Sequence, residues 1–104
     1  MKTTNEIIFR AHDLGAVREY YAGRLGLPIV LDNDSMVGFN AGSLNFYFER
    51  GAPSGPVFEF TVDDVASAKE ELTSAGCELV EENPAIPRIY LRDPFGLVFN
   101  ITEP

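Results

Sequence analysis

The chain has 104 residues, of which 45% are hydrophobic and 12% aromatic, and it carries a formal net charge of −8 at pH 7. This length and apolar content suffice for one globular domain over residues 1–104 and argue against general disorder. Its eight Lys and Arg residues are scattered, which argues against a nucleic-acid partner because phosphate binding needs clustered positive charge. No apolar run is long enough to span a bilayer, so we expect a soluble, cytoplasmic protein with no membrane partner.

A strand and a helix are predicted at the start of the chain. Residues 6–11 alternate with the period of two that is typical of a half-buried strand, with Ile7 and Phe9 on the same face. Asp13 is a favourable N-cap for the helix that follows, and Gly26 can adopt the positive φ that ends a helix. The apolar stripe of this helix is expected at Leu14, Val17, Tyr21 and Leu25.

The rest of the first half is predicted to be three short strands and a linker. The strands are expected at residues 28–31, 35–40 and 43–49, with turns at residues 32–34 and 41–42. Residues 51–55 lie in the one Gly- and Pro-rich stretch of the chain. We expect them to link the two halves.

The second half repeats the order of the first at a shift of 51 residues, so that Asp64 stands where the first half has Asp13. A helix is expected over residues 65–75, with its apolar stripe at Val65, Ala68, Leu72 and Ala75. Strands are expected at residues 77–80, 88–92 and 97–101, the last two joined by a turn at Asp93–Gly96. The sequence therefore predicts an α+β fold with two tandem βαβββ modules, at about residues 5–50 and 56–103.

Five segments carry a resemblance to a known superfamily. They are Arg10–Leu14, Tyr20–Tyr21, Leu25–Leu27, Phe60–Val65 and Tyr90–Gly96. In their order and spacing they resemble the vicinal oxygen chelate superfamily, which includes glyoxalase I, bleomycin-resistance proteins and extradiol dioxygenases. The resemblance implies that the two modules form a curved mixed sheet around a cleft, and that the protein is a two-fold homodimer. It does not specify an activity, because this scaffold hosts several unrelated chemistries.

The resemblance also implies where a metal would bind. Family enzymes carry His or Glu ligands at the start of the first strand and on the last strand of each module. Counted from the aspartates of the matching segments, these positions hold Glu6, Asn45, Val57 and Asn100. One carboxylate, two amides and a valine lack the donors that bind transition metals well, so we expect no metal and no other cofactor.

Strand alternation divides the remaining side chains between two faces. The Phe-rich face is predicted to be core against the helices; it comprises Phe9, Phe46, Phe48, Phe58, Phe60, Phe99 and Ile101. The other face would line the cleft and bind a small molecule through Glu6, Ile8, Arg10, Asn45, Tyr47, Val57, Glu59 and Asn100. This polar, mildly acidic set suits a cationic or aromatic ligand. Alternatively, Arg10 pairs with Glu59 or Glu6 and the polar groups only satisfy one another.

Two functions from different classes remain open. The first is a metal-free binding protein that sequesters a cationic or aromatic compound such as an antibiotic. The alternative is a metal-dependent lyase, isomerase or dioxygenase in which Glu6 is one ligand and others come from Glu49, Glu59 or His12. Glu6 is also the one weak candidate for a catalytic base. Cys77 follows a helix C-terminus, where the helix dipole disfavours a thiolate, and is predicted to be structural.

Overall fold

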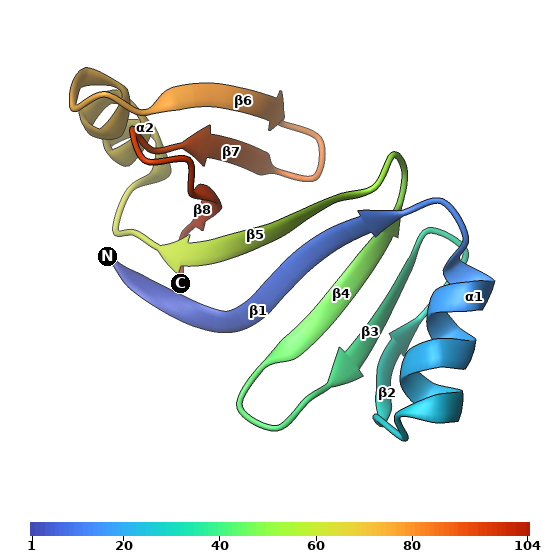
Figure 1. Cartoon of the computed structure of the whole chain (residues 1–104). Helices are drawn as coiled ribbons and strands as arrows, with labels where there is room; N and C mark the ends of the chain where they lie inside the picture. The colour runs from blue at the N-terminus through green and yellow to red at the C-terminus, as the bar shows by residue number, and fades with distance from the viewer. The chain divides into compact units, whose positions relative to one another are not determined.

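The computed structural model describes all residues from Met1 to Pro104, and the chain divides into two compact units (Figure 1). Module 1 is the unit of residues 5–56, and module 2 is the unit of residues 57–104 together with residues 1–4. Each strand that crosses these bounds is described with the module that holds most of it. None of the helices has the length and apolar character needed to cross a membrane.

Module 1 is a four-stranded sheet with one helical segment. Its elements are β1 (Lys2–Ala11), α1 (Leu14–Arg18), the π-helical turn η1 (Glu19–Arg24), β2 (Ile29–Asp32), β3 (Met36–Asn40) and β4 (Asn45–Arg50). The strand order is β2-β3-β4-β1, and β1 runs parallel to β4 while the other neighbours are antiparallel. The helical segment α1 packs against β3 and β4.

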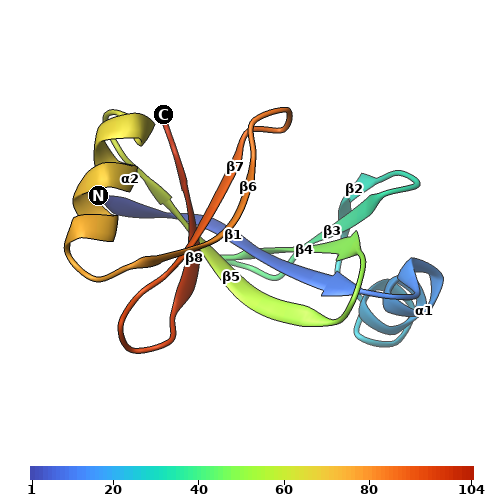
Figure 2. The same ribbon diagram turned by 90° about the horizontal axis from the view of Figure 1, so that it is seen from above.

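Module 2 has the same architecture. Its elements are β5 (Ser54–Thr61), α2 (Val65–Ser74), β6 (Glu78–Asn83), β7 (Arg88–Arg92) and β8 (Val98–Thr102). The order β6-β7-β8-β5, with β5 parallel to β8, repeats the order of module 1. In Figures 1 and 2, α2 lies to one side of β6, β7 and β8. Two βαβββ modules and an α+β fold are therefore confirmed.

The core of module 1 lies between its sheet and helix. Leu14 is buried with Val37, Phe39 and Phe48, and Phe9 and Phe46 pack against them as predicted. Tyr21 places its ring 5.2 Å from Phe48. Leu25, however, was predicted in this stripe and is 54% exposed. The π-helical turn explains the error, because its wider spacing, with the Leu25 amide bonded to the Tyr20 carbonyl, rotates Leu25 away from the core.

The core of module 2 is built in the same way. Val62, Leu91, Phe99 and Ile101 are buried, and the predicted helix positions Val65, Ala68 and Leu72 pack against them. Phe58 and Phe60 join this core, so the Phe-rich face is confirmed as core in both modules. Ala75 is exposed, because α2 ends at Ser74.

The predicted linker is the main error in the element bounds. β5 begins at Ser54, so residues 54 and 55 belong to a strand rather than to the linker, and β1 begins four residues early, at Lys2. Gly55, the second glycine of this stretch, permits close packing instead. A Cβ on Gly55 would lie 2.9 Å from the carbonyl oxygen of Ile8, and Gly55 has a φ of +110°, which favours glycine.

The turn between β7 and β8 depends on one carboxylate. Asp93 accepts hydrogen bonds from the backbone N–H of Phe95 at 2.8 Å and of Leu97 at 2.9 Å. Gly96, in the same turn, has a φ of +100°. The Asp93 side chain therefore closes the turn as the sequence pattern predicts.

The first prediction concerns the stability of this turn. Asp93→Ala should lower the free energy of unfolding by about 1–2 kcal/mol, because two backbone donors lose their acceptor. Urea denaturation followed by circular dichroism measures the change. Asp34→Ala, in the β2–β3 turn, is the matched control because it removes the same charge without these bonds. Equal effects of the two substitutions would contradict the assignment.

Cys77 packs against the core of module 2. Desolvation raises the pKa of its thiol, and the negative charge of Asp93 raises this pKa further. A raised pKa leaves less thiolate at neutral pH, and the thiolate is the reactive form. The geometry thus fits the predicted structural role.

The second prediction follows from this pKa. Alkylation of Cys77 by iodoacetamide should reach half its maximal rate at a higher pH in the folded protein than in urea. Asp93→Asn should move that midpoint to lower pH, because it removes one of the two causes of the shift. A native midpoint at or below that of the unfolded chain would refute the assignment.

Candidate functional site

The sheet of module 1 has a face that points away from α1, which we call distal face 1. On β1 it carries Glu6, Ile8 and Arg10, which pair with Asn45, Tyr47 and Glu49 of β4. Paired residues share a face of a sheet, whereas the intervening Phe9, Phe46 and Phe48 lie in the core. All five site residues predicted in this module therefore lie on one face, in two adjacent strands.

An ion pair occupies one end of distal face 1. Arg10 Nε lies 3.0 Å from Glu49 Oε1, and the two side chains are 25% and 21% exposed. Glu59 and Glu6 were the expected partners of Arg10, whereas Glu49, its direct neighbour across the sheet, is a partner in the structure. Because Glu6 adds a second carboxylate, the three ionisable groups leave this face with net negative charge.

The amide of Asn45 is engaged within the module. Its Oδ1 accepts a hydrogen bond of 3.0 Å from Asn40 Nδ2, and Asn40 stands opposite Asn45 on β3. The amide oxygen is the atom with which Asn would bind a cation. Here that oxygen already satisfies a donor.

The corresponding face of module 2, distal face 2, carries a second polar group. Glu59 stands beside Asn100 and accepts a hydrogen bond from Asn100 Nδ2 at 3.3 Å. Asn100 is only 7% exposed, and its Oδ1 accepts from the Ile89 backbone N–H at 2.9 Å. Both ends of this buried amide are thus used, which is the usual condition for burying one.

Sequence reasoning missed three residues of distal face 2. Arg88 lies 4.8 Å from the centre of the Tyr90 ring and forms an ion pair of 3.1 Å with Glu81. Tyr90 pairs with Asn100 on one side and Glu81 on the other. Strand alternation from Asn100 across the antiparallel neighbours would have found them, but that needs the register, which the sequence does not supply.

The registers of the two modules can be compared directly. Ile8 pairs with Tyr47 in module 1, and Glu59, which stands 51 residues after Ile8, pairs with Asn100 in module 2. Tyr47 is therefore the counterpart of Asn100 on the last strand of its module. Asn45 lies one pair further along the same face.

The residues present do not fit a catalytic metal. Glu6 is the one carboxylate at the four predicted ligand positions, Val57 offers no donor, and the oxygens of Asn45 and Asn100 already accept hydrogen bonds. Replacing Asn45 by Tyr47 in the set adds no carboxylate or imidazole. Within neither module do three or more His, Cys, Asp or Glu side chains gather as metal ligands would.

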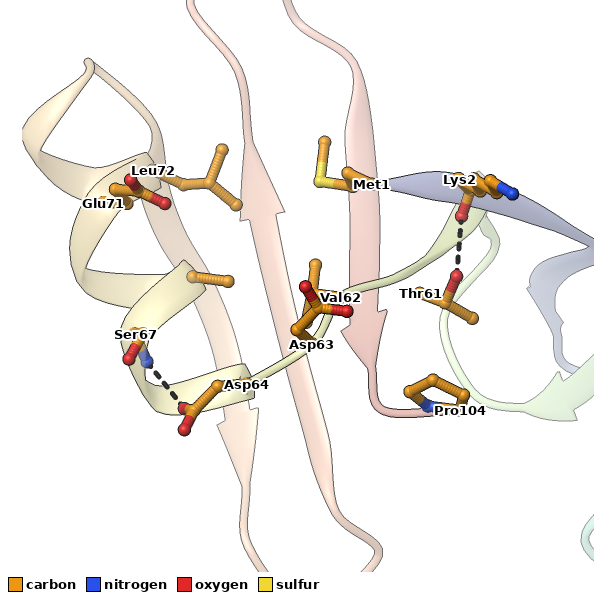
Figure 3. Close-up of a pocket in the computed structure, with 11 residues that line it drawn as sticks. Met1, Lys2, Thr61, Val62, Asp63, Asp64, Ser67, Glu71, Leu72 and Pro104 are labelled. Carbon is orange, nitrogen blue, oxygen red and sulfur yellow. Dashed lines mark hydrogen bonds between the residues drawn. The ribbon is translucent and has the colours of Figure 1, made fainter.

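Module 2 also has an open groove of about 730 Å³ beside α2 (Figure 3). Thr61 and Asp64, which line it, are already used: Thr61 Oγ1 donates to the Lys2 carbonyl, and Asp64 caps α2 by accepting from the Ser67 N–H at 3.0 Å. None of the predicted site residues lines the groove. The groove therefore lies apart from the predicted site.

Known proteins resemble this chain in sequence pattern and in fold. The family model of the Glyoxalase-like domain matches residues 6–102. A glyoxalase/bleomycin resistance protein/dioxygenase superfamily member from Vibrio splendidus is similar at a TM-score of 0.71 and 15% identity, over 99% of this chain and 100% of that one. A hypothetical protein from Bacillus halodurans is similar at a TM-score of 0.74 and 13% identity, over 100% and 96%.

A larger enzyme shares the fold as well. Homoprotocatechuate 2,3-dioxygenase from Brevibacterium fuscum, in complex with 3,4-dihydroxyphenylacetate, is similar at a TM-score of 0.71 and 15% identity. The similarity covers 98% of this chain but only 37% of the dioxygenase chain. No curated protein matches the sequence. At these identities the solved structures show a shared fold, and function depends on the side chains that the fold carries.

Proposed function

The chain belongs to the Glyoxalase-like domain family, and on that premise we propose that it is a metal-free binding protein for a small cationic or aromatic compound, such as an antibiotic. The binding surface is distal face 1, with Glu6, Arg10, Asn45, Tyr47 and Glu49. The observation that carries the proposal is the donor set at the family's ligand positions, in which Glu6 is the only carboxylate.

The charge and chemistry of distal face 1 support the choice of ligand. Distal face 1 carries two carboxylates, Glu6 and Glu49, and one guanidinium, Arg10, which pairs with Glu49 at 3.0 Å, so the formal charge of these three groups is negative. The net charge of −8 on the chain adds a long-range field that favours cations. Tyr47, which stands between Asn45 and Glu49 on β4, supplies an aromatic ring on this face, and aromatic rings attract cations to their faces.

The neighbours of Glu6 support binding rather than proton transfer. A general base that works without a metal needs a second group to protonate or stabilise the product. The residue opposite Glu6 on β4 is Asn45, whose oxygen is bonded to Asn40. Arg10, the cation of this face, is held by Glu49.

The third prediction tests the metal-free character of the site. Chelator-treated protein titrated with Mn²⁺, Fe²⁺, Ni²⁺ and Zn²⁺ at neutral pH should give no calorimetric signal for a micromolar site, because amide and valine side chains replace imidazole and carboxylate ligands. One ion bound tightly per chain would overturn the proposal and favour a metal-dependent lyase, isomerase or dioxygenase.

The fourth prediction tests the role of Glu6. Glu6→Gln should weaken the binding of ethidium, a planar organic cation, by about fivefold, the effect of losing roughly 1 kcal/mol of attraction at a solvated surface. Fluorescence titration measures the affinity, and the urea midpoint should stay unchanged. Glu70→Gln on α2 makes the same charge change away from this face and serves as the control. Equal losses in the two variants would indicate a general charge effect instead.

A further inference from the structure

Gly38 lies on β3 directly opposite Tyr47 of β4. A Cβ built on Gly38 would lie 2.6 Å from Tyr47 Cε1 and 2.7 Å from Tyr47 Cδ1. Real Cβ atoms do not approach other carbons this closely, so the tyrosine ring occupies the space in which a side chain at position 38 would begin. Gly38 itself is buried, which is consistent with cover by this ring.

The backbone does not require glycine at this position. Gly38 is not among the glycines of positive φ, and a glycine inside a strand costs stability relative to residues with side chains. The lack of a side chain at position 38 therefore does not change the backbone conformation. It leaves room above the sheet for the ring of Tyr47. Leu31 of β2, whose Cβ would lie 3.3 Å from the same point, forms the far side of this space.

Module 2 shows the alternative solution at the same place. Tyr90 pairs with Asn100 as Gly38 pairs with Tyr47, so Tyr90 is the counterpart of Gly38. In module 2 the residue at this position, Tyr90, supplies the ring with its own side chain. Tyr90 is 4% exposed, and the guanidinium of Arg88 lies over its ring. In module 1 the ring comes from the neighbouring strand and Tyr47 remains partly exposed.

We propose that Gly38 is the positioning residue for Tyr47. Because position 38 has no side chain, the Tyr47 ring lies close against distal face 1 and forms a stacking surface for the planar part of the ligand. This inference rests on the proposed function and deepens it, because it narrows the ligand from a cationic or aromatic compound to a flat aromatic cation. The ring supplies stacking and cation–π attraction, and Glu6, on the neighbouring strand β1, supplies the opposite charge.

The charge and the ring act on different parts of such a ligand. An aliphatic cation would gain the attraction of Glu6 and a cation–π contact with the ring, but it has no flat face that could stack on the ring. A flat anion would gain the ring but would be repelled by the negative formal charge of this face. The inference therefore predicts the order ethidium above tetraethylammonium, and both above 1-anilinonaphthalene-8-sulfonate.

The experiment combines Gly38→Ala, Tyr47→Ala, the double variant and Tyr47→Phe, with ethidium as the probe. Tyr47→Ala should weaken binding about tenfold and Tyr47→Phe less than about twofold, since the ring is kept. Gly38→Ala should weaken binding about tenfold because it displaces the ring. In the double variant it should cause no loss of affinity beyond that of Tyr47→Ala, because the ring is already absent. Gly23→Ala is the matched control, because its Cβ meets only Glu19 Cγ, at 3.9 Å.

A second readout separates positioning from stability. Ethidium should shift the backbone NMR signal of Gly38 in the native protein, which loss of fold would not mimic. If Gly38→Ala does not fold, Tyr47→Ala, which introduces no clash, still decides the question by its affinity.

The outcomes distinguish the two levels of the proposal. Ethidium binding that is insensitive to Tyr47→Ala, or a Gly38→Ala loss that persists in the Tyr47→Ala background, overturns the role of this pair and leaves the metal-free binding function intact. No binding of any of the three probes to the native protein overturns the proposed ligand class and this inference together. Binding of a metal ion in the calorimetric titration overturns the proposed function alone.

Discussion

The parallel pairing of the first and last strand of each module is the constraint on which the rest depends. It brings β1 beside β4 and β5 beside β8, and two strands that run the same way can meet only after a crossover. The helix and the two short strands between them make that crossover; the strands extend the sheet, and the helix covers one face of it. The other face then receives alternate side chains of the paired strands, so the register of this pairing decides which chemistry gathers there.

The two modules apply this constraint to different side chains. Ile8 and Tyr47 in module 1 correspond to Glu59 and Asn100 in module 2, so an apolar and aromatic pair stands where the other module has a bonded carboxylate and amide. Within module 2 the buried amide of Asn100 is satisfied by Glu59 and by the backbone N–H of Ile89, as burial demands. Module 1 keeps a partly exposed ion pair and a ring on its distal face, which makes it the better candidate for recognition.

Several features were readable from the sequence because they depend on local pattern. Asp13 and Asp64 cap the helices, Asp93 closes its turn, and the Phe-rich positions form the core, since capping, turn chemistry and strand period act within a few residues. The linker was misjudged because Gly55 serves a close approach to Ile8, and composition alone does not separate that use from flexibility. Leu25 was misplaced because a π-helical turn replaced the regular helix.

The sequence by itself determined the duplicated α+β plan and the core, because these follow from residue type, spacing and period. Only the tertiary structure decided which side chains meet: Arg10 with Glu49, Asn45 with Asn40, and Tyr47 over Gly38. The physical reason is that strand register is fixed by packing across the whole sheet. The packing of the Tyr47 ring over Gly38 cannot be predicted from the sequence, because it depends on which strand lies beside β3.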